Sequence, residues 1–128
     1  MILLDTHVFY WVLASPERLG PACRGSIEQA KVVHVSAISH VEFRIKVATG
    51  RRAMPPATFA DLAARGFREL PFTHSHAARL ADLPDDLARH DPFDRMLLAQ
   101  ALDEGLTFWT SDRRLLAQDL EFVRDANA

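Results

Sequence analysis

Acidic residues stand at several points where a parallel sheet would gather them. Asp5 follows the apolar run MILL, Glu42 lies six residues past Ser36, and three more acids come from two later segments: Asp91, Asp94 and Asp112. Collected carboxylates repel one another unless a cation lies among them or some are protonated. Groups that offer only oxygen suit hard cations, so the expected ions are Mg²⁺ or Mn²⁺. Such ions bind phosphate oxygens and activate water, which indicates hydrolysis of a phosphodiester or phosphomonoester.

Short apolar runs that alternate with longer helical patterns must position these acids. The expected strands are Met1–Leu4, Lys31–Ser36, Glu69–Phe72 (weak), Leu106–Thr110 and a final edge strand, Glu121–Arg124. The expected helices are Pro16–Ala30, a helix capped by Ser36 or Ser39 that runs to Thr49, Ala57–Arg65, His74–Leu83, Pro92–Glu104 and Asp112–Gln118. The alternation predicts an α/β fold with a mainly parallel sheet of four to five strands.

Ligands of open parallel sheets bind at the carboxyl ends of the strands. Asp5 directly follows the first predicted strand, and Thr110, Ser111 and Asp112 follow the fourth. Each acid also has a purely structural interpretation. Asp5, Asp91 (before Pro92) and Asp112 suit helix N-termini, Asp94 suits the helix dipole, and Glu42 suits an exposed helix face. Convergence of all these acids on one edge favours a functional site, because independent helix caps need not share a cleft.

The composition of the chain limits the classes of protein to which it can belong. The chain has 128 residues, 48% hydrophobic and 25% charged, which is typical of a globular protein and predicts a single domain over residues 1–128. The formal net charge of −2 argues against a generic nucleic-acid coat, although thirteen of the fifteen basic residues are arginines. The longest apolar stretch, near Val8–Ser15, is too short to span a bilayer, and the N-terminus lacks a basic signal-peptide region, so we expect a cytoplasmic protein with no membrane contact.

Several other chemistries are disfavoured. One cysteine, Cys23, excludes an internal disulfide and a zinc site built from cysteines, and it fits a small buried residue. The histidines lack zinc-site spacing, although His7 and His90 lie near acids and could contact phosphate. The sequence contains no GxxxxGK[ST], GxGxxG or GxSxG motif.

Four segments in order carry a resemblance to a known family: LLDTHVFYW, VSAISHVEFRIKVATGR, HDPFDRMLLAQAL and TFWTSDRRL. Together they resemble a PIN domain of the VapC type, the ribonuclease toxin of toxin–antitoxin pairs. The resemblance covers nearly the whole chain, and HDPFDRMLLAQA is its most specific part. His40 and Val41 depart from the family, which usually carries an aromatic residue just before the position of Glu42.

The resemblance implies a three-layer α/β/α fold and a metal-dependent endoribonuclease that cuts single-stranded RNA. Asp5, Glu42, Asp94 and Asp112 match the family's acidic quartet, which binds Mg²⁺ or Mn²⁺. Thr6, Ser36 and Thr110 match polar positions that support the acids by hydrogen bonds, and Asp91 is either an accessory ligand or a helix cap. The resemblance also implies a VapB-type antitoxin as partner and a homodimer or a hetero-oligomer with that antitoxin. Contacts to the RNA backbone are then expected from Arg44, Lys46, Arg51, Arg52, Arg95, Arg113 and Arg114.

Two other classes compete. A Mg²⁺-dependent phosphatase with a doubly wound sheet usually carries Asp-x-Asp after its first strand, but here Thr6 and His7 follow Asp5. A receiver or other non-enzymatic interaction domain would need paired acids near its start and a lysine at a strand end. The two lysines of this chain, Lys31 and Lys46, fit that arrangement poorly.

Overall fold

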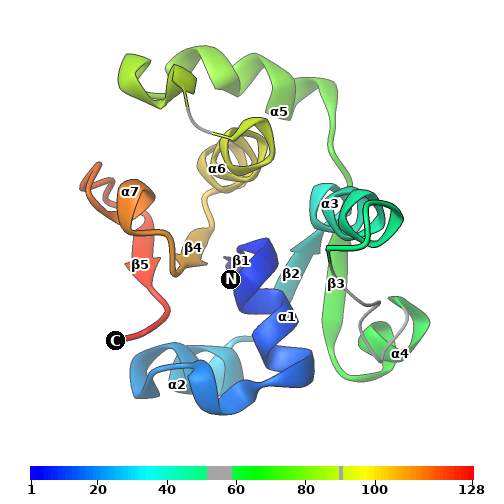
Figure 1. Cartoon of the computed structure of the whole chain (residues 1–128). Helices are drawn as coiled ribbons and strands as arrows, with labels where there is room; N and C mark the ends of the chain where they lie inside the picture. Colours follow the sequence, from blue (N-terminus) through cyan, green and yellow to red (C-terminus); the bar gives the residue numbers. More distant parts are fainter. Residues whose placement is uncertain (52–58, 90) are drawn as a thin grey trace.

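The computed structural model describes residues 1–51, 59–89 and 91–128 (Figure 1). Within these residues five strands form one sheet in the order β3-β2-β1-β4-β5, and every neighbouring pair is parallel. The strands are β1 (Ile2–Leu4), β2 (Val33–Ser36), β3 (Phe67–Leu70), β4 (Thr107–Thr110) and β5 (Val123–Asp125). This confirms the predicted α/β class and its parallel sheet.

The central strand shows why the fold has three layers. Successive side chains of a strand point to opposite faces of the sheet. Ile2 and Leu4 therefore join one apolar core, while Leu3 between them joins the other. Both faces of the sheet must be covered, and helices of the crossover connections cover them.

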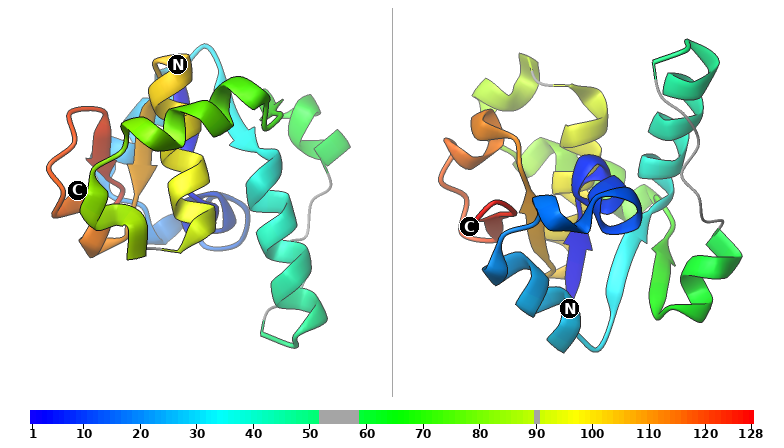
Figure 2. Two further views of the ribbon diagram at one scale, coloured as in Figure 1. Left: turned by 90° about the horizontal axis from the view of Figure 1, so that it is seen from above. Right: turned by 60° about the horizontal axis from the view of Figure 1, so that its bottom comes forward.

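Two groups of helices provide this cover. On the Ile2 and Leu4 side lie α1 (Thr6–Ala14), η1 (Pro16–Arg18) and α2 (Pro21–Gln29). On the Leu3 side lie α5 (His74–Arg79), η2 (Leu80–Asp82), η3 (Asp85–Arg89), α6 (Pro92–Glu104) and α7 (Arg113–Leu116). Figure 2 shows α5 and α6 in front of the sheet in one view and α1 and α2 in front in the other.

Helix α3 (Ala37–Ala48) stands at the margin between the two cores. Phe43 packs into the first core, against Phe9 with ring centroids 6.0 Å apart, and Ile38 packs against the second. Its start is the expected cap: the Ser36 hydroxyl accepts a hydrogen bond from the Ile38 N–H at 3.0 Å. Helix α4 (Phe59–Ala64) follows, and the predicted start of this helix at Ala57 lies outside the described residues.

The boundaries of α6 agree with the sequence pattern. Asp91 caps the helix, Pro92 is its first residue, and Gly105 ends it with a positive φ of 67°. Glycine adopts this left-handed conformation without the steric cost that a Cβ would add. The position of α6 matters for function, because its N-terminus carries two of the candidate acids.

The structure differs from the prediction mainly near the N-terminus. Residues 6–14 form α1, for which the nearly continuous run VFYWVLA shows no helical periodicity, since several of its sides are packed against other elements. The predicted helix Pro16–Ala30 is split into η1 and α2 at Gly20. A Cβ on Gly20 would lie only 2.0 Å from the Ala128 carbonyl oxygen, so the chain needs glycine at this close approach. The third strand lies two residues earlier than expected.

The helices of the described residues are all shorter or more polar than a membrane span requires.

Candidate active site

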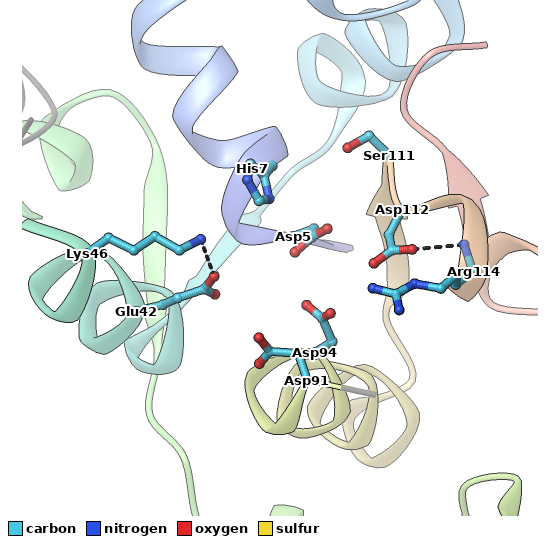
Figure 3. Close-up of a pocket in the computed structure, with 9 residues that line it drawn as sticks. All are labelled: Asp5, His7, Glu42, Lys46, Asp91, Asp94, Ser111, Asp112 and Arg114. Carbon is cyan, nitrogen blue, oxygen red and sulfur yellow. Dashed lines mark hydrogen bonds and ion pairs between the residues drawn. The ribbon is translucent and has the colours of Figure 1, made fainter. Parts of the chain in front are cut away.

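A pocket of about 340 Å³ opens at the carboxyl ends of β1 and β4 (Figure 3). Five acids from four separate segments meet there, together with three residues that can carry positive charge. The residues that line it are Asp5, His7, Glu42, Lys46, Asp91, Asp94, Ser111, Asp112 and Arg114. The structure therefore brings together every member of the predicted acidic quartet, and Asp91 with them.

Asp5 is fixed more firmly than a single helix cap requires. The residue is 3% exposed, and its Oδ1 accepts a hydrogen bond from the Thr6 N–H at 2.7 Å. Its Oδ2 accepts from the Thr110 hydroxyl, also at 2.7 Å. The Thr110 hydroxyl in turn accepts from the Asp112 N–H at 3.1 Å, so this threonine links the ends of β1 and β4. Thr110 thus contacts Asp5 through its side chain, whereas Thr6 does so through its backbone N–H, and the Thr6 hydroxyl is bonded to Ser39 Oγ at 2.9 Å.

The other aspartates occupy helix N-termini that face the same space. Asp91 accepts a hydrogen bond from the Phe93 N–H at 2.8 Å, and Asp112 accepts from the Arg114 N–H at 2.8 Å. Asp94 is the third residue of α6. The capping role and the pocket-lining role are therefore held by the same side chains, and one does not exclude the other.

Glu42 reaches the pocket from α3 and is 6% exposed. Its Oε2 accepts a hydrogen bond from the Lys46 ammonium at 2.7 Å. Its Oε1 is buried and has no hydrogen-bond partner among the described residues. Figure 3 shows this carboxylate directed toward Asp5 and Asp94. A buried carboxylate oxygen without a donor is costly, and a cation at this point would satisfy it.

Burial and mutual repulsion raise the pKa of two of the acids above the usual value for aspartate. Burial raises the pKa of Asp94 to about 8, with further contributions from Asp5, Asp91, Glu42 and Asp112. Burial also raises the pKa of Asp5 to about 6, although the Thr110 and Thr6 hydrogen bonds oppose that rise. A hard divalent cation would relieve this repulsion, because the acids offer it only oxygen. The residues present therefore fit Mg²⁺ or Mn²⁺.

Only some of the basic residues expected to contact RNA line the acidic pocket. Lys46 and Arg114 line the pocket, whereas Arg113 turns away and pairs with Asp125 at 2.6 Å. Arg95 lines a different pocket, beside Leu80. Two further candidates, Arg44 and Arg51, are exposed, while Arg52 and His90 lie outside the described residues.

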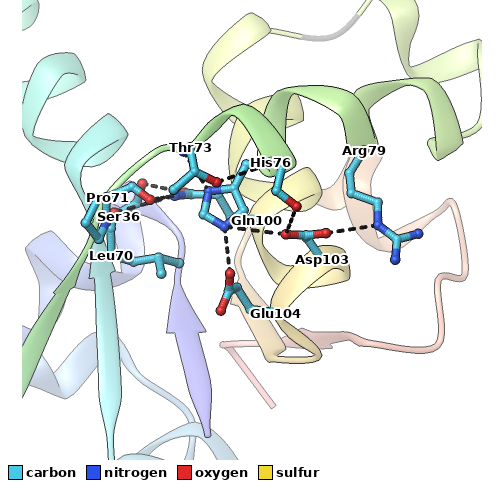
Figure 4. A network of polar contacts seen from close by, with 10 residues as sticks. Ser36, Leu70, Pro71, Thr73, His76, Arg79, Gln100, Asp103 and Glu104 are labelled. Carbon is cyan, nitrogen blue, oxygen red and sulfur yellow. Dashed lines mark hydrogen bonds and ion pairs between the residues drawn. The ribbon is translucent and has the colours of Figure 1, made fainter.

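Ser36 was predicted to support the acids by hydrogen bonds, but its hydroxyl is bonded to the backbone of α3 and to Gln100. Besides capping α3, its hydroxyl donates to Gln100 Oε1 at 2.5 Å, and the Gln100 amide donates to the Pro71 carbonyl at 3.2 Å (Figure 4). The same amide also donates to the Leu70 carbonyl at 3.4 Å. Gln100 is fully buried and ties α6 to the start of α3 and the end of β3. Sequence reasoning missed this residue; its only sign is a polar side chain within the apolar run LLAQAL.

A second group of possible metal ligands lies away from the pocket. His76, Asp103 and Glu104 place one ligand atom each within 4.8 Å of one another. The Thr73 N–H donates to His76 Nδ1 at 3.0 Å, so in the neutral ring Nε2 carries the proton and donates to Glu104 Oε2 at 2.9 Å. Asp103 Oδ1 already accepts from Arg79 at 3.1 Å. These bonds join α5 to α6 (Figure 4), and we interpret the group as structural.

Comparison with known proteins identifies the family of this fold. The family model of the PIN domain matches residues 2–120. Ribonuclease VapC22 of Mycobacterium tuberculosis (strain ATCC 25618 / H37Rv) is 37% identical over 116 residues, 89% of this chain and 88% of the relative.

Two solved structures share the architecture. One is VapBC2 from Rickettsia felis bound to a DNA fragment from their promoter, with a TM-score of 0.71, 13% identity and 98% of each chain covered. The other is FitAcB from Neisseria gonorrhoeae, with a TM-score of 0.59, 28% identity and 96% of each chain covered. The resemblance of the sequence motifs is thus confirmed, and the chain belongs to the PIN-domain family.

Proposed function

We propose that this protein is a divalent-metal-dependent ribonuclease and the toxin of a toxin–antitoxin pair. The observation that carries the proposal is the pocket in which Asp5, Glu42, Asp94 and Asp112 meet, with an unpaired buried oxygen on Glu42. Similarity to a relative named as a ribonuclease supports RNA as the substrate. Single-stranded or loop RNA is the proposed form, because proteins read RNA sequence mainly from unpaired bases.

The four acids of the quartet would hold Mg²⁺ or Mn²⁺, and Asp91 would be an accessory ligand or only a cap. When bound, such an ion activates water and neutralises the charge that develops on the scissile phosphate. Thr110 and the Thr6 N–H hold both oxygens of Asp5 in place. The reaction needs no protein nucleophile. Asp5 would hold the cation from the end of β1, Asp94 and Asp112 from the N-termini of α6 and α7, and Glu42 from the middle of α3.

Residues on the pocket rim would position the RNA backbone. Arg114 stands on the Asp112 side and Lys46 on the Glu42 side, with the acids between them (Figure 3). Charged contacts of this kind hold phosphates without reading sequence. His7 and Ser111 line the same pocket and can donate hydrogen bonds to phosphate oxygens.

A protein partner is also proposed. Another solved structure with this fold is a toxin–antitoxin complex from Klebsiella pneumoniae, with a TM-score of 0.68, 17% identity and 97% of this chain covered. An antitoxin of the VapB type would bind this chain and suppress cleavage, and a homodimer or a hetero-oligomer with the antitoxin is the expected assembly. Growth arrest on expression of this chain alone, relieved by co-expression of its antitoxin, would support this part of the proposal; healthy growth at verified expression would count against it.

Cleavage of RNA by the purified chain tests the enzymatic proposal. Total cellular RNA is incubated with the protein in Mg²⁺, in Mn²⁺ and in EDTA, and the new ends are sequenced. Discrete cuts that need metal are the expected result. A metal-dependent release of inorganic phosphate from small phosphomonoesters, without RNA cuts, would favour the phosphatase class instead.

A further inference from the structure

The ion pair between Lys46 and Glu42 differs from an ordinary exposed ion pair on a helix, because it lies in the wall of the acidic pocket. It lies one turn after Glu42 on α3, and its ammonium is 2.7 Å from Glu42 Oε2. The Lys46 side chain is 22% exposed and the Glu42 side chain 8%. Both residues line the pocket that also holds the other acids. The pair is therefore part of the site's wall.

The pair satisfies only half of the Glu42 carboxylate. Oε2 has the Lys46 ammonium, while Oε1 is buried without a hydrogen-bond partner among the described residues. The ammonium thus supplies a positive charge beside a crowded group of carboxylates, where the proposed function would place a dication. A single charge at one oxygen leaves the rest of the cluster uncompensated.

A dication among the acids would change the electrostatic interactions of Lys46. It would attract Glu42 and repel the ammonium, since like charges a few ångströms apart repel strongly in a partly buried site. Lysine has a flexible four-carbon stem, so its ammonium can move while α3 stays in place. The pocket also gives it room, and a phosphate of the RNA backbone would bring the negative charge that it needs.

We propose that Lys46 is a movable counter-ion that pairs with Glu42 in the metal-free protein and transfers to an RNA phosphate when a divalent cation takes Glu42. This inference rests on the proposed function. It assigns Lys46 two opposing effects: the lysine weakens metal binding and strengthens RNA binding. A residue that only stabilises α3 would have neither effect, and a metal-supporting residue would strengthen both.

The chain offers a matched control, because its only other lysine is Lys31, which lies on the wall of a different pocket. Lys46→Met, Lys46→Arg and Lys31→Met are compared with the wild type after circular dichroism has shown that each is folded. If Lys46→Met does not fold, Lys46→Gln replaces it. Mn²⁺ affinity is measured by titration calorimetry, and binding of a phosphorothioate-linked single-stranded RNA 12-mer is measured by fluorescence anisotropy, with Mn²⁺ and with EDTA.

We expect Lys46→Met to bind Mn²⁺ about 3- to 10-fold more tightly than the wild type. In saturating Mn²⁺ it should bind the 12-mer about 3- to 10-fold more weakly, whereas in EDTA the two should be similar. Lys46→Arg should restore 12-mer binding, and Lys31→Met should match the wild type. Unchanged or weaker Mn²⁺ binding by Lys46→Met, or 12-mer binding equal to that of Lys31→Met, would overturn the inference.

Wild-type behaviour separates this inference from the proposed function. A wild type that binds Mn²⁺ and cuts RNA, beside a Lys46→Met variant that matches Lys31→Met, refutes only the movable counter-ion. A wild type that neither binds Mn²⁺ nor cuts RNA refutes the proposed function and the inference together.

Discussion

The crowded acids should make the metal-free protein less stable as the pH rises, and Asp94→Asn should remove much of this effect. The pKa of Asp94 rises from 3.8 in the unfolded chain to about 8 in the folded protein, and that of Asp5 rises to about 6. At a pH between the unfolded and the folded pKa of each residue, the folded protein binds a proton that the unfolded chain does not. The free energy of unfolding therefore falls as the pH increases from about 4 to 8.

The magnitude follows from the size of the pKa change. A rise from 3.8 to about 8 would correspond to roughly 6 kcal/mol if it acted in full on folding. Asp94 is only half-buried, and solvent screens its charge, so we expect about 2 to 3 kcal/mol from this residue. Asparagine has nearly the same shape and no charge, so Asp94→Asn should gain that amount over wild type near pH 8 and little near pH 4.

Urea unfolding in EDTA across this pH range measures the difference. Asp119→Asn is the matched control, because Asp119 is exposed and its φ of 53° is one that asparagine tolerates. Excess Mn²⁺ should stabilise the wild type increasingly as the pH rises, since the cation competes with protons for the same carboxylates. If the stability profile of Asp94→Asn runs parallel to that of the wild type, the like-charge repulsion assigned to Asp94 is wrong.

Three other substitutions test the supports of the site and the fold. Thr110→Val removes a donor to Asp5 and should move the pH midpoint of Mn²⁺ binding upward by about half a unit or more; an unchanged midpoint in calorimetric titrations would refute this role. Gln100→Leu leaves the Ser36 hydroxyl and the Pro71 carbonyl without this partner and should cost about 1 to 3 kcal/mol in urea unfolding, against no loss if the network is incidental. Gly20→Ala forces a Cβ against the Ala128 carbonyl and should cost about 1 to 3 kcal/mol in the same assay, whereas wild-type stability would show that the chain end yields freely.

The convergence of the acids could be predicted because it follows from topology. Once residues 2–4 and 107–110 form parallel strands, the residues after them must share an edge, and Asp5 and Asp112 are those residues. The helix α1 could not be predicted from periodicity, since its aromatic residues pack on several sides.

The ion-pair and hydrogen-bond partners of individual side chains could not be predicted from the sequence either. Arg113 and Arg114 are adjacent arginines, and only the structure shows that Arg113 pairs with Asp125 while Arg114 lines the pocket. Lys46 was expected at RNA phosphate but pairs with Glu42 in this structure. Gln100 looks like any polar helix residue until β3 and α3 are packed against it.

The most direct test of the central claim compares RNA cleavage by wild type, Asp94→Asn and Asp119→Asn under identical conditions. Each folded protein is incubated with total RNA in Mn²⁺ and in EDTA, and the new 5′ and 3′ ends are mapped by sequencing. The account predicts the same discrete cuts for wild type and Asp119→Asn in Mn²⁺, with none in EDTA and at least about 100-fold fewer for Asp94→Asn. Full cleavage by Asp94→Asn, or equal cleavage in EDTA, would contradict the assignment of these acids to a metal-dependent ribonuclease site.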